Sequence, residues 1–172
     1  FEIWSAMLAD GTDVPYVDIM GNGTPMNPAW EFLRLITGFG RHTAAGVMMC
    51  AADRLAAGLP YLTRKYVALG LELQAELEEA MGANGVILHP PYNRVAPPHW
   101  DAFRTPFAPA HTALFNVMEF PVTQVPTGFG RKGMPLGIQV VGSRGMDHLT
   151  IAAAKEIEDQ LGGWQIAEPT ET

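Results

Sequence analysis

Two short apolar runs joined by a glycine-rich turn constrain the fold of this chain more than any other feature. The runs are PVTQV (121–125) and LGIQVVG (136–142), and the link between them contains the polar turn Arg131-Lys132-Gly133. Strand-like runs on either side of such a turn predict an antiparallel hairpin. The two strands are apolar on both faces, which is typical of strands buried between two layers. The chain is therefore expected to build a sheet that is covered on both sides.

The other periodic segments predict one more strand and several helices. The run VILHPP, ended by two prolines, predicts a short buried strand. Helices are expected at the chain start and at 27–37, 41–57, 60–81 and 148–161, with a short helical turn at 112–117. Residues 10–27 are rich in Gly, Pro, Asn and Asp and predict a loop. This indicates an α/β chain of about three strands and five helices, and so few strands indicate part of a larger body.

Capping residues and apolar stripes give these helices their expected ends and faces. Asn27 before Pro28 predicts a helix start, and Asp147 is expected to cap the last helix, which stops at Gly162. The helix 41–57 is expected to bury one face, made of Ala45, Met48, Met49, Ala52, Leu55 and Ala56. The helix 60–81 has the stripe Leu62, Tyr66, Leu69, Leu73 and Leu77.

Composition excludes several classes of protein. The chain has 172 residues and a formal net charge of −7. It is 48% hydrophobic and only 17% charged, a composition that differs from that of disordered chains. The acidic balance argues against nucleic acid or an anionic membrane surface as a partner, and no run reaches the length of a membrane span. Cys50 is the only cysteine, which fits a reducing compartment or indifference to redox; we expect a cytoplasmic location and an inert core thiol.

The reactive residue types do not assemble into a catalytic or metal-binding motif. Among the five histidines, His89 and His99 lie in a proline-rich segment with no metal-ligand spacing, while His111 precedes an apolar turn and is expected to face a pocket. Ser5 and Ser143 are the only serines, and neither lies in a nucleophile motif. We therefore expect no catalytic residue, no metal site and no cofactor within these residues.

Residues 111–164 resemble the C-terminal region of the amidase signature family. The resemblance is carried by Asn116, Phe120-Pro121, the run Gly133-Met134-Pro135-Leu136-Gly137-Ile138-Gln139, and Gly145-Met146-Asp147 before the last helix. FPVTQVP, DHLTIA and GGW are most similar to the fatty acid amide hydrolase type 2-like branch of that family. Residues 1–110 fit more loosely, through LHPPYNRVAPPH.

The resemblance implies a fold and a reaction for the parent protein. It implies a mixed sheet flanked by helices. It also implies hydrolysis of carboxylic amides by a nucleophilic Ser and a second Ser, both in a Gly-Gly-Ser-Ser-Gly segment, and by a Lys that lies far upstream of this region. No such segment occurs in this chain. It also implies that Thr127, Gly128 and Phe129 face an acyl channel, which we extend to His111.

Three hypotheses follow for the function of the chain. The first is that residues 1–172 are the C-terminal portion of a single amidase domain, inert alone, whose partners are a small amide substrate and the N-terminal portion or a second copy. A start at Phe1 within an uncapped helix favours it. The second is an independent binding or oligomerisation module without catalysis. The third is a hydrolase that uses His111 or Cys50 in its own chemistry.

Overall fold

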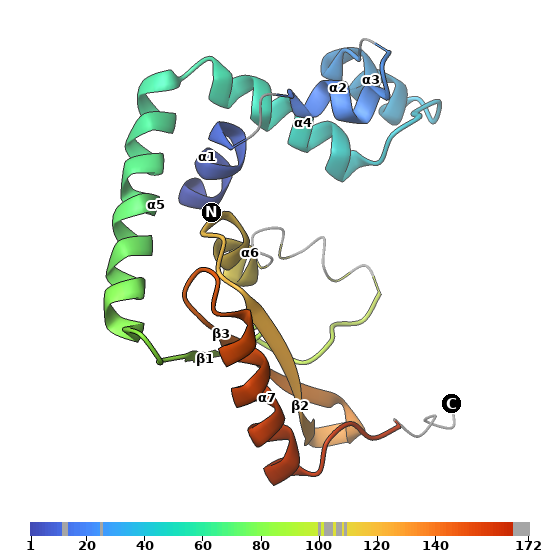
Figure 1. Ribbon diagram of the computed structural model, residues 1–172. Coiled ribbons are helices and arrows are strands. Elements are labelled where there is room, and N and C mark those ends of the chain that lie inside the picture. The colour runs from blue at the N-terminus through green and yellow to red at the C-terminus, as the bar shows by residue number, and fades with distance from the viewer. Residues whose placement is uncertain are drawn as a thin grey trace. The chain divides into compact units, whose positions relative to one another are not determined.

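The computed structural model describes residues 1–11, 14–24, 26–99, 101, 105, 108 and 110–166, without the side chains of residues 55, 56 and 110. It divides into two compact units, one of residues 2–70 and one that contains residues 71–172 together with Phe1. Figure 1 labels the elements, which in chain order are α1 (Glu2–Asp10), α2 (Tyr16–Gly21), α3 (Pro28–Ile36), α4 (Ala44–Ala57), α5 (Pro60–Met81), β1 (Ile87–His89), α6 (Ala110–Val117), β2 (Val122–Phe129), the 3-10 turn η2 (Arg131–Gly133), β3 (Pro135–Val141) and α7 (Asp147–Leu161).

The three strands form one antiparallel sheet in the order β1-β3-β2. The predicted hairpin is confirmed, because β2 pairs antiparallel with β3 from Val122 opposite Val141 to Phe129 opposite Pro135. Lys132 in the η2 turn has a φ of 67°, a left-handed conformation that reverses the chain between the two strands. β1 pairs with the other edge of β3. The α/β class and the three strands are therefore confirmed.

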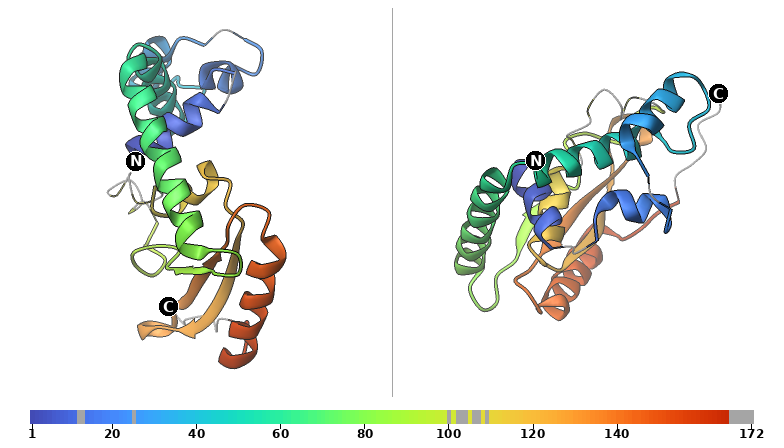
Figure 2. Two further views of the ribbon diagram at one scale, coloured as in Figure 1. Left: turned by 60° about the vertical axis from the view of Figure 1, so that its left-hand side comes forward. Right: turned by 90° about the horizontal axis from the view of Figure 1, so that it is seen from above.

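The helix α7 covers one face of this sheet. Figures 1 and 2 show it alongside β2, and its residue Ala154 packs in a buried cluster with Val125 of β2 and Val140 of β3. A hydroxyl chain ties the same layers together, since Thr123 Oγ1 donates to Thr150 Oγ1 at 2.9 Å and Thr150 Oγ1 donates to the Asp147 carbonyl at 2.8 Å. The helix α7 thus covers the part of this face around Val140, while Leu88, which pairs with Val140, is 52% exposed.

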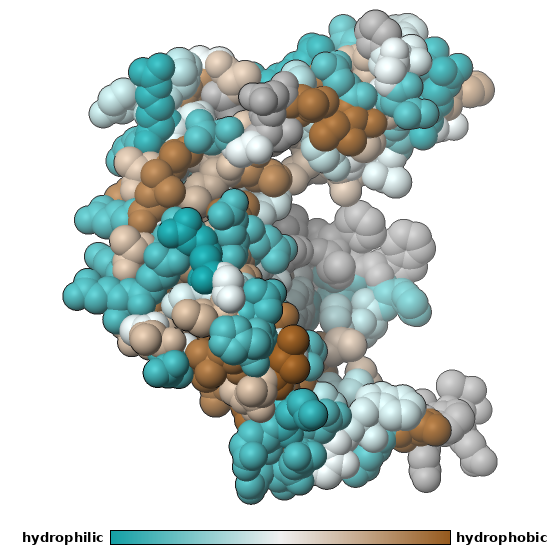
Figure 3. All heavy atoms as spheres, viewed as in Figure 1, coloured by the Kyte–Doolittle hydropathy of each residue, from teal (hydrophilic) through white to brown (hydrophobic). Residues whose placement is uncertain are grey.

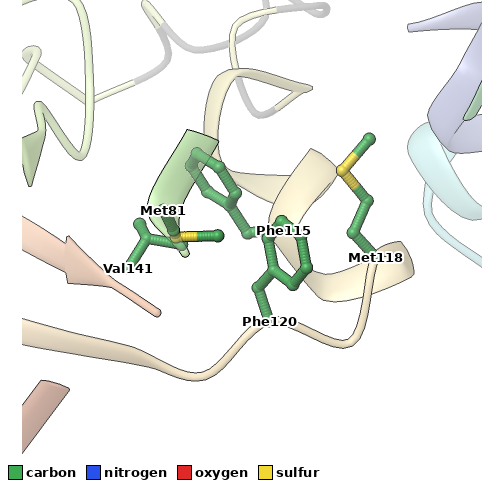
Figure 4. Close-up of a cluster of buried hydrophobic side chains, with 5 residues drawn as sticks. All are labelled: Met81, Phe115, Met118, Phe120 and Val141. Carbon is green, nitrogen blue, oxygen red and sulfur yellow. The ribbon is translucent and has the colours of Figure 1, made fainter. Parts of the chain in front are cut away.

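The opposite face of the sheet carries the second apolar cluster. Because side chains alternate along a strand, Val141 points away from α7. It packs with Met81 at the end of α5 and with Phe115, Met118 and Phe120 in and after α6 (Figure 4). The expected stripe of the long helix is confirmed only in its C-terminal part: Leu73 and Leu77 pack against this cluster, whereas Leu62 and Leu69 are 42% and 40% exposed. Both faces of the sheet are therefore covered, as the strand composition predicts.

The unit of residues 2–70 is all helical in its described part and corrects two expectations. Asn27 caps α3 as predicted, because its Oδ1 accepts from the amides of Ala29 and Trp30 at 3.0 and 3.4 Å. The prediction that residues 10–27 form a loop is wrong, since α2 lies within them. Tertiary burial overrides the loop composition there, because Val17 of α2 packs in a buried cluster with Met26 and Cys50.

The predicted face of the second helix is also wrong. α4 begins at Ala44, where the Thr43 hydroxyl accepts from the Gly46 amide at 3.2 Å, and it buries Val47 and Cys50 while Met48 is 64% exposed. Ala and Met occur all around this helix, so their spacing does not single out one face. The predicted positions Leu55 and Ala56 lie outside the described side chains.

Two smaller expectations about helices need correction. Asp147 is the first residue of α7 rather than its cap; Met146 occupies the cap position without a side-chain hydrogen bond. The described residues contain seven α-helices instead of about five, because α2 is added and the turn expected at 112–117 is a helix, α6, from Ala110. The described residues 90–99 form neither helix nor strand, as their prolines predict.

Candidate functional site

A row of polar side chains crosses all three strands on the face of the sheet opposite α7. His89 of β1 pairs with Gln139 of β3, and Gln139 pairs in turn with Gln124 of β2. Directly paired residues point to the same side of a sheet. The row therefore lies on the same face as Val141 and next to the apolar cluster, because Gln139 precedes Val141 by two residues in β3.

Glycine makes room for one member of this row. A Cβ atom at Gly137 would lie 2.2 Å from Gln124 Nε2 and 2.9 Å from the Val125 carbonyl oxygen. These distances are too short for any side chain. The Val125 carbonyl is backbone and gives way less easily than the flexible Gln124 side chain, which donates to it at 3.3 Å, so the close approach of the backbone is what favours glycine at 137.

The helix α6 brings His111 to the β1 end of the row. The imidazole rings of His89 and His111 have centroids 4.5 Å apart at an interplanar angle of 41°. The ring of Phe115, one turn further along α6, contacts His89 edge-on at 4.9 Å. His111 is exposed, whereas His89 is partly buried beneath these rings. The structure thus assembles two imidazoles and a carboxamide at one edge of the sheet.

This environment favours the neutral form of His89. Burial is the main cause that lowers the pKa of His89, and the neighbouring His111 lowers it further, while the Gln139 side chain offsets part of the shift. His89 Nδ1 and Gln139 Oε1 are both buried, and neither has a hydrogen-bond partner of good geometry among the described residues. A neutral imidazole and a carboxamide oxygen can both accept hydrogen bonds, so the row offers acceptors for an N–H or O–H group.

The other predicted channel residues lie at the far end of β2. The β2–β3 register shifts between Pro126 and Gly128, so Thr127 is the bulged residue, and Gly128 has a φ of 106° that favours glycine. Phe129 is 40% exposed. Thr127 is three residues beyond Gln124, roughly 10 Å along the strand. A channel lined by both His111 and Thr127–Phe129 stays a prediction.

The remaining candidates of the sequence lie outside this row. Cys50 is fully buried, as predicted, and burial raises the pKa of its thiol, with Asp53 adding to the effect. Ser5 donates to the Glu2 carbonyl within its own helix, and Ser143 lies 4.0 Å from the sulfur of Met81. In the described part of the chain, no group of three His, Cys, Asp or Glu side chains could hold a metal ion.

Sequence reasoning missed the polar row because its members are far apart along the chain. In the sequence, His89 attracts attention only as a metal ligand, Gln124 only as part of a strand, and Gln139 only as part of a strand and of the amidase-like run. The alternation within β2 and β3 places each glutamine on one face, but only the pairing with β1 brings His89 level with them. A single sequence does not contain that register.

A solved structure has the same fold. The crystal structure of an amidase matches 84% of this chain and 40% of its own chain, with a TM-score of 0.51 and 22% sequence identity. At this identity the match defines the fold alone: the chain has part of an amidase fold. The described residues contain no helix that is long and apolar enough to cross a membrane.

Two curated proteins with similar sequences are fatty-acid amide hydrolases. Fatty-acid amide hydrolase 2 of Homo sapiens is 35% identical over 170 residues, which are 95% of this chain and 32% of that protein. Fatty-acid amide hydrolase 2-A of Danio rerio is 34% identical over 180 residues, covering all of this chain and 33% of that protein. No family model matches the chain. The chain is thus homologous over most of its length to fatty-acid amide hydrolase 2, an amidase signature enzyme, and spans about a third of these relatives.

Proposed function

We propose that this chain is the C-terminal portion of an amidase that hydrolyses carboxylic amides, and that it supplies scaffold and substrate-channel wall rather than the bond-breaking groups. The observation that carries the proposal is the 35% identity to human fatty-acid amide hydrolase 2 over 95% of the chain. The chain spans 32% of that relative, so the serine and lysine chemistry expected of the family is assigned to the remaining portion.

The edges of the sheet support a role as part of a larger body. With the order β1-β3-β2, the outer edges of β1 and β2 have no strand partner among the described residues. β2 is eight residues long, and long unpaired edges are rarely left open in stable proteins. The N-terminal portion of the amidase, or a second copy of this chain, is the proposed partner for these edges.

The available nucleophiles support the assignment of catalysis elsewhere. Both serines have neighbours that explain them structurally, one in α1 and one in the turn before α7. Lys132 and Lys155 are exposed, and Lys65 Nζ lies 5.7 Å from the ring of its neighbour Tyr66. Among the described residues, the contacts of the two serine hydroxyls are not with lysine: Ser5 donates to the Glu2 carbonyl and Ser143 lies against Met81, whereas a Ser-Lys mechanism needs the two groups in contact.

The polar row provides the proposed contact with substrate. An amide substrate has an N–H group, and its proposed acceptor is Gln139 Oε1, which has no hydrogen-bond partner of good geometry among the described residues. His111, Thr127, Gly128 and Phe129 are proposed to line the channel around it. The expected cytoplasmic location rests on the single cysteine and stays a prediction.

The test compares this chain with the longer protein from its own gene. Hydrolysis of an aryl amide such as a decanoyl anilide is measured for the 18.7 kDa chain, with its purity established by intact mass, and for the protein that also contains the upstream portion. We expect turnover only in the longer protein, and lower kcat/KM when Gln139→Leu is introduced there. Turnover by the chain alone would refute the division of roles.

The alternative of an independent binding or oligomerisation module makes a different prediction. Such a module is monodisperse and melts cooperatively without a partner. The amidase portion instead exposes apolar groups and sheet edges, and is expected to self-associate or to bind the upstream portion when the two are co-expressed. Size-exclusion chromatography of the isolated chain and of the co-expressed pair distinguishes the two.

A further inference from the structure

Two adjoining cavities lie on the surface of the unit of residues 2–70, next to α3. One has a volume of about 530 Å³ and is lined by Trp30, Leu33, Arg34, Thr37, Phe39 and Arg41. The other, of about 500 Å³, shares Trp30, Arg34 and Arg41 with the first and extends along α2 toward Asn22 and His42. Volumes of this size suit a small organic molecule. Neither cavity belongs to the polar row of the sheet.

The first cavity has an apolar wall that is open to solvent. Trp30 is 55% exposed, Leu33 49% and Phe39 78%, and all three line it. Figure 3 shows apolar side chains reaching the surface over the segment that contains α2 to α4. Large apolar side chains that gather in one exposed hollow are typical of a binding surface.

The charges around the shared wall leave one positive charge in excess. Burial tends to raise the pKa of Glu31, but hydrogen bonds from Arg34 and from the Arg41 amide outweigh it and hold the pKa below its ordinary value. Glu31 is 5% exposed, and Arg34 Nη1 donates to its Oε1 at 3.0 Å. The negative charge of Glu31 is therefore matched by Arg34. The Arg41 guanidinium has no ion pair among the described residues, although its backbone amide donates to Glu31 Oε2 at 3.4 Å.

The side chains that form this wall are held in place. The Arg34 guanidinium lies 5.6 Å from the centroid of the Trp30 ring, so the same arginine binds Glu31 and covers the indole. Arg41 is therefore the one cation on the shared wall, in the described part of the chain, whose guanidinium is open to a ligand. A planar guanidinium binds a carboxylate or a phosphate through two parallel hydrogen bonds.

We propose that these two cavities bind a monocarboxylate with an aliphatic or aryl tail, its carboxylate on Arg41 and its tail against Trp30, Leu33 and Phe39. A single excess positive charge suits a monoanion, and the apolar wall favours a tail over a purely polar anion. The site is independent of amide hydrolysis and of the assignment of the sheet face to the substrate channel.

Titration of the whole 172-residue chain with octanoate and with its neutral isostere octanamide tests this proposal. The readout is the Trp30 indole N–H resonance, assigned by its loss in Trp30→Phe. We expect octanoate to shift this resonance saturably, with a dissociation constant at least about fivefold below that of octanamide, because only the carboxylate pairs with Arg41.

Variants establish where the carboxylate lies. Arg41→Gln is expected to weaken octanoate binding by about five- to tenfold while leaving octanamide binding unchanged, and Arg41→Lys to retain part of the preference. Arg64→Gln, which removes an exposed arginine of α5, is the matched control and is expected to bind octanoate like the unaltered chain. Equal affinities for octanoate and octanamide, an unaffected Arg41→Gln variant, or no saturable shift would each overturn the proposal.

Discussion

The hydroxyl chain between β2 and α7 gives the sharpest test of how the sheet is held. Thr150 is 1% exposed, and its Oγ1 both accepts from Thr123 Oγ1 and donates to the Asp147 carbonyl. Thr150→Val keeps the shape of the side chain and removes both hydrogen bonds. It also leaves the Thr123 hydroxyl without that acceptor. At about 1 kcal/mol for each bond, we expect a loss of about 2 kcal/mol in the free energy of unfolding.

A double-mutant cycle that adds Thr123→Val to Thr150→Val makes the prediction specific. Thr123→Val removes only the bond between the two hydroxyls, so its expected cost is about 1 kcal/mol. In the double variant no hydroxyl is left unpaired, and its cost is expected to match that of Thr150→Val alone. The two substitutions therefore have an expected coupling energy of about 1 kcal/mol.

Native-state hydrogen exchange of the Val140 and Val141 amides in β3 is the assay, because it reports the opening of this unit rather than of the whole chain. Lys155→Ala, an exposed change on α7, is the control and is expected to alter the opening free energy by less than about 0.5 kcal/mol. Strictly additive losses for the two threonines would refute the proposed chain of hydrogen bonds.

Three further predictions follow from the electrostatics. Because burial lowers the pKa of His89 below its unfolded value, the folded state binds fewer protons than the unfolded state. The free energy of unfolding is therefore retained above about pH 6.5 and falls as the pH drops toward the folded pKa. His89→Gln is expected to flatten this pH dependence in hydrogen-exchange data. An NMR titration in which the His89 ring protonates at or above the ordinary histidine value contradicts the argument. Burial and the nearby Asp53 raise the pKa of the buried Cys50 thiol. We therefore expect Cys50 to react with a thiol reagent at least about a hundredfold more slowly in native buffer than in denaturant. Equal rates would place the thiol at the surface. Glu78 accepts two hydrogen bonds from Arg144, at 2.8 and 3.3 Å, and this pairing lowers the pKa of Glu78. Glu78→Gln is expected to lower the free energy of unfolding slightly in dilute buffer and to have no effect in concentrated salt. A loss that persists in salt would indicate a role in packing instead.

The sequence predicted those parts of the fold that depend on neighbours along the chain. The hairpin of β2 and β3 follows from two apolar runs and a polar glycine turn, and the start of α3 follows from Asn27 before Pro28. The long helix α5 follows from its leucine repeat. In each case the hydrogen bonds involved join residues close in sequence, so a local pattern contains the information.

The faces of helices were predicted less well, and the reason is compositional. α4 has apolar residues around most of its circumference, and its orientation is decided by what packs on it, which buries Val47 and Cys50 and exposes Met48. α2 has the composition of a loop and is helical because Val17 packs with Met26 and Cys50. In both helices, contacts with residues distant in sequence determine which side chains are buried.

The sequence alone therefore determined the strands, the turn between β2 and β3 and the likeness to amidases, because those features are carried by short ordered runs of residues. Only the tertiary structure decided that His89, Gln139 and Gln124 form one row with His111 beside it. The row depends on the register between strands about fifty residues apart in sequence, as the pairing of His89 with Gln139 makes plain. That register is not encoded in any local pattern of the sequence.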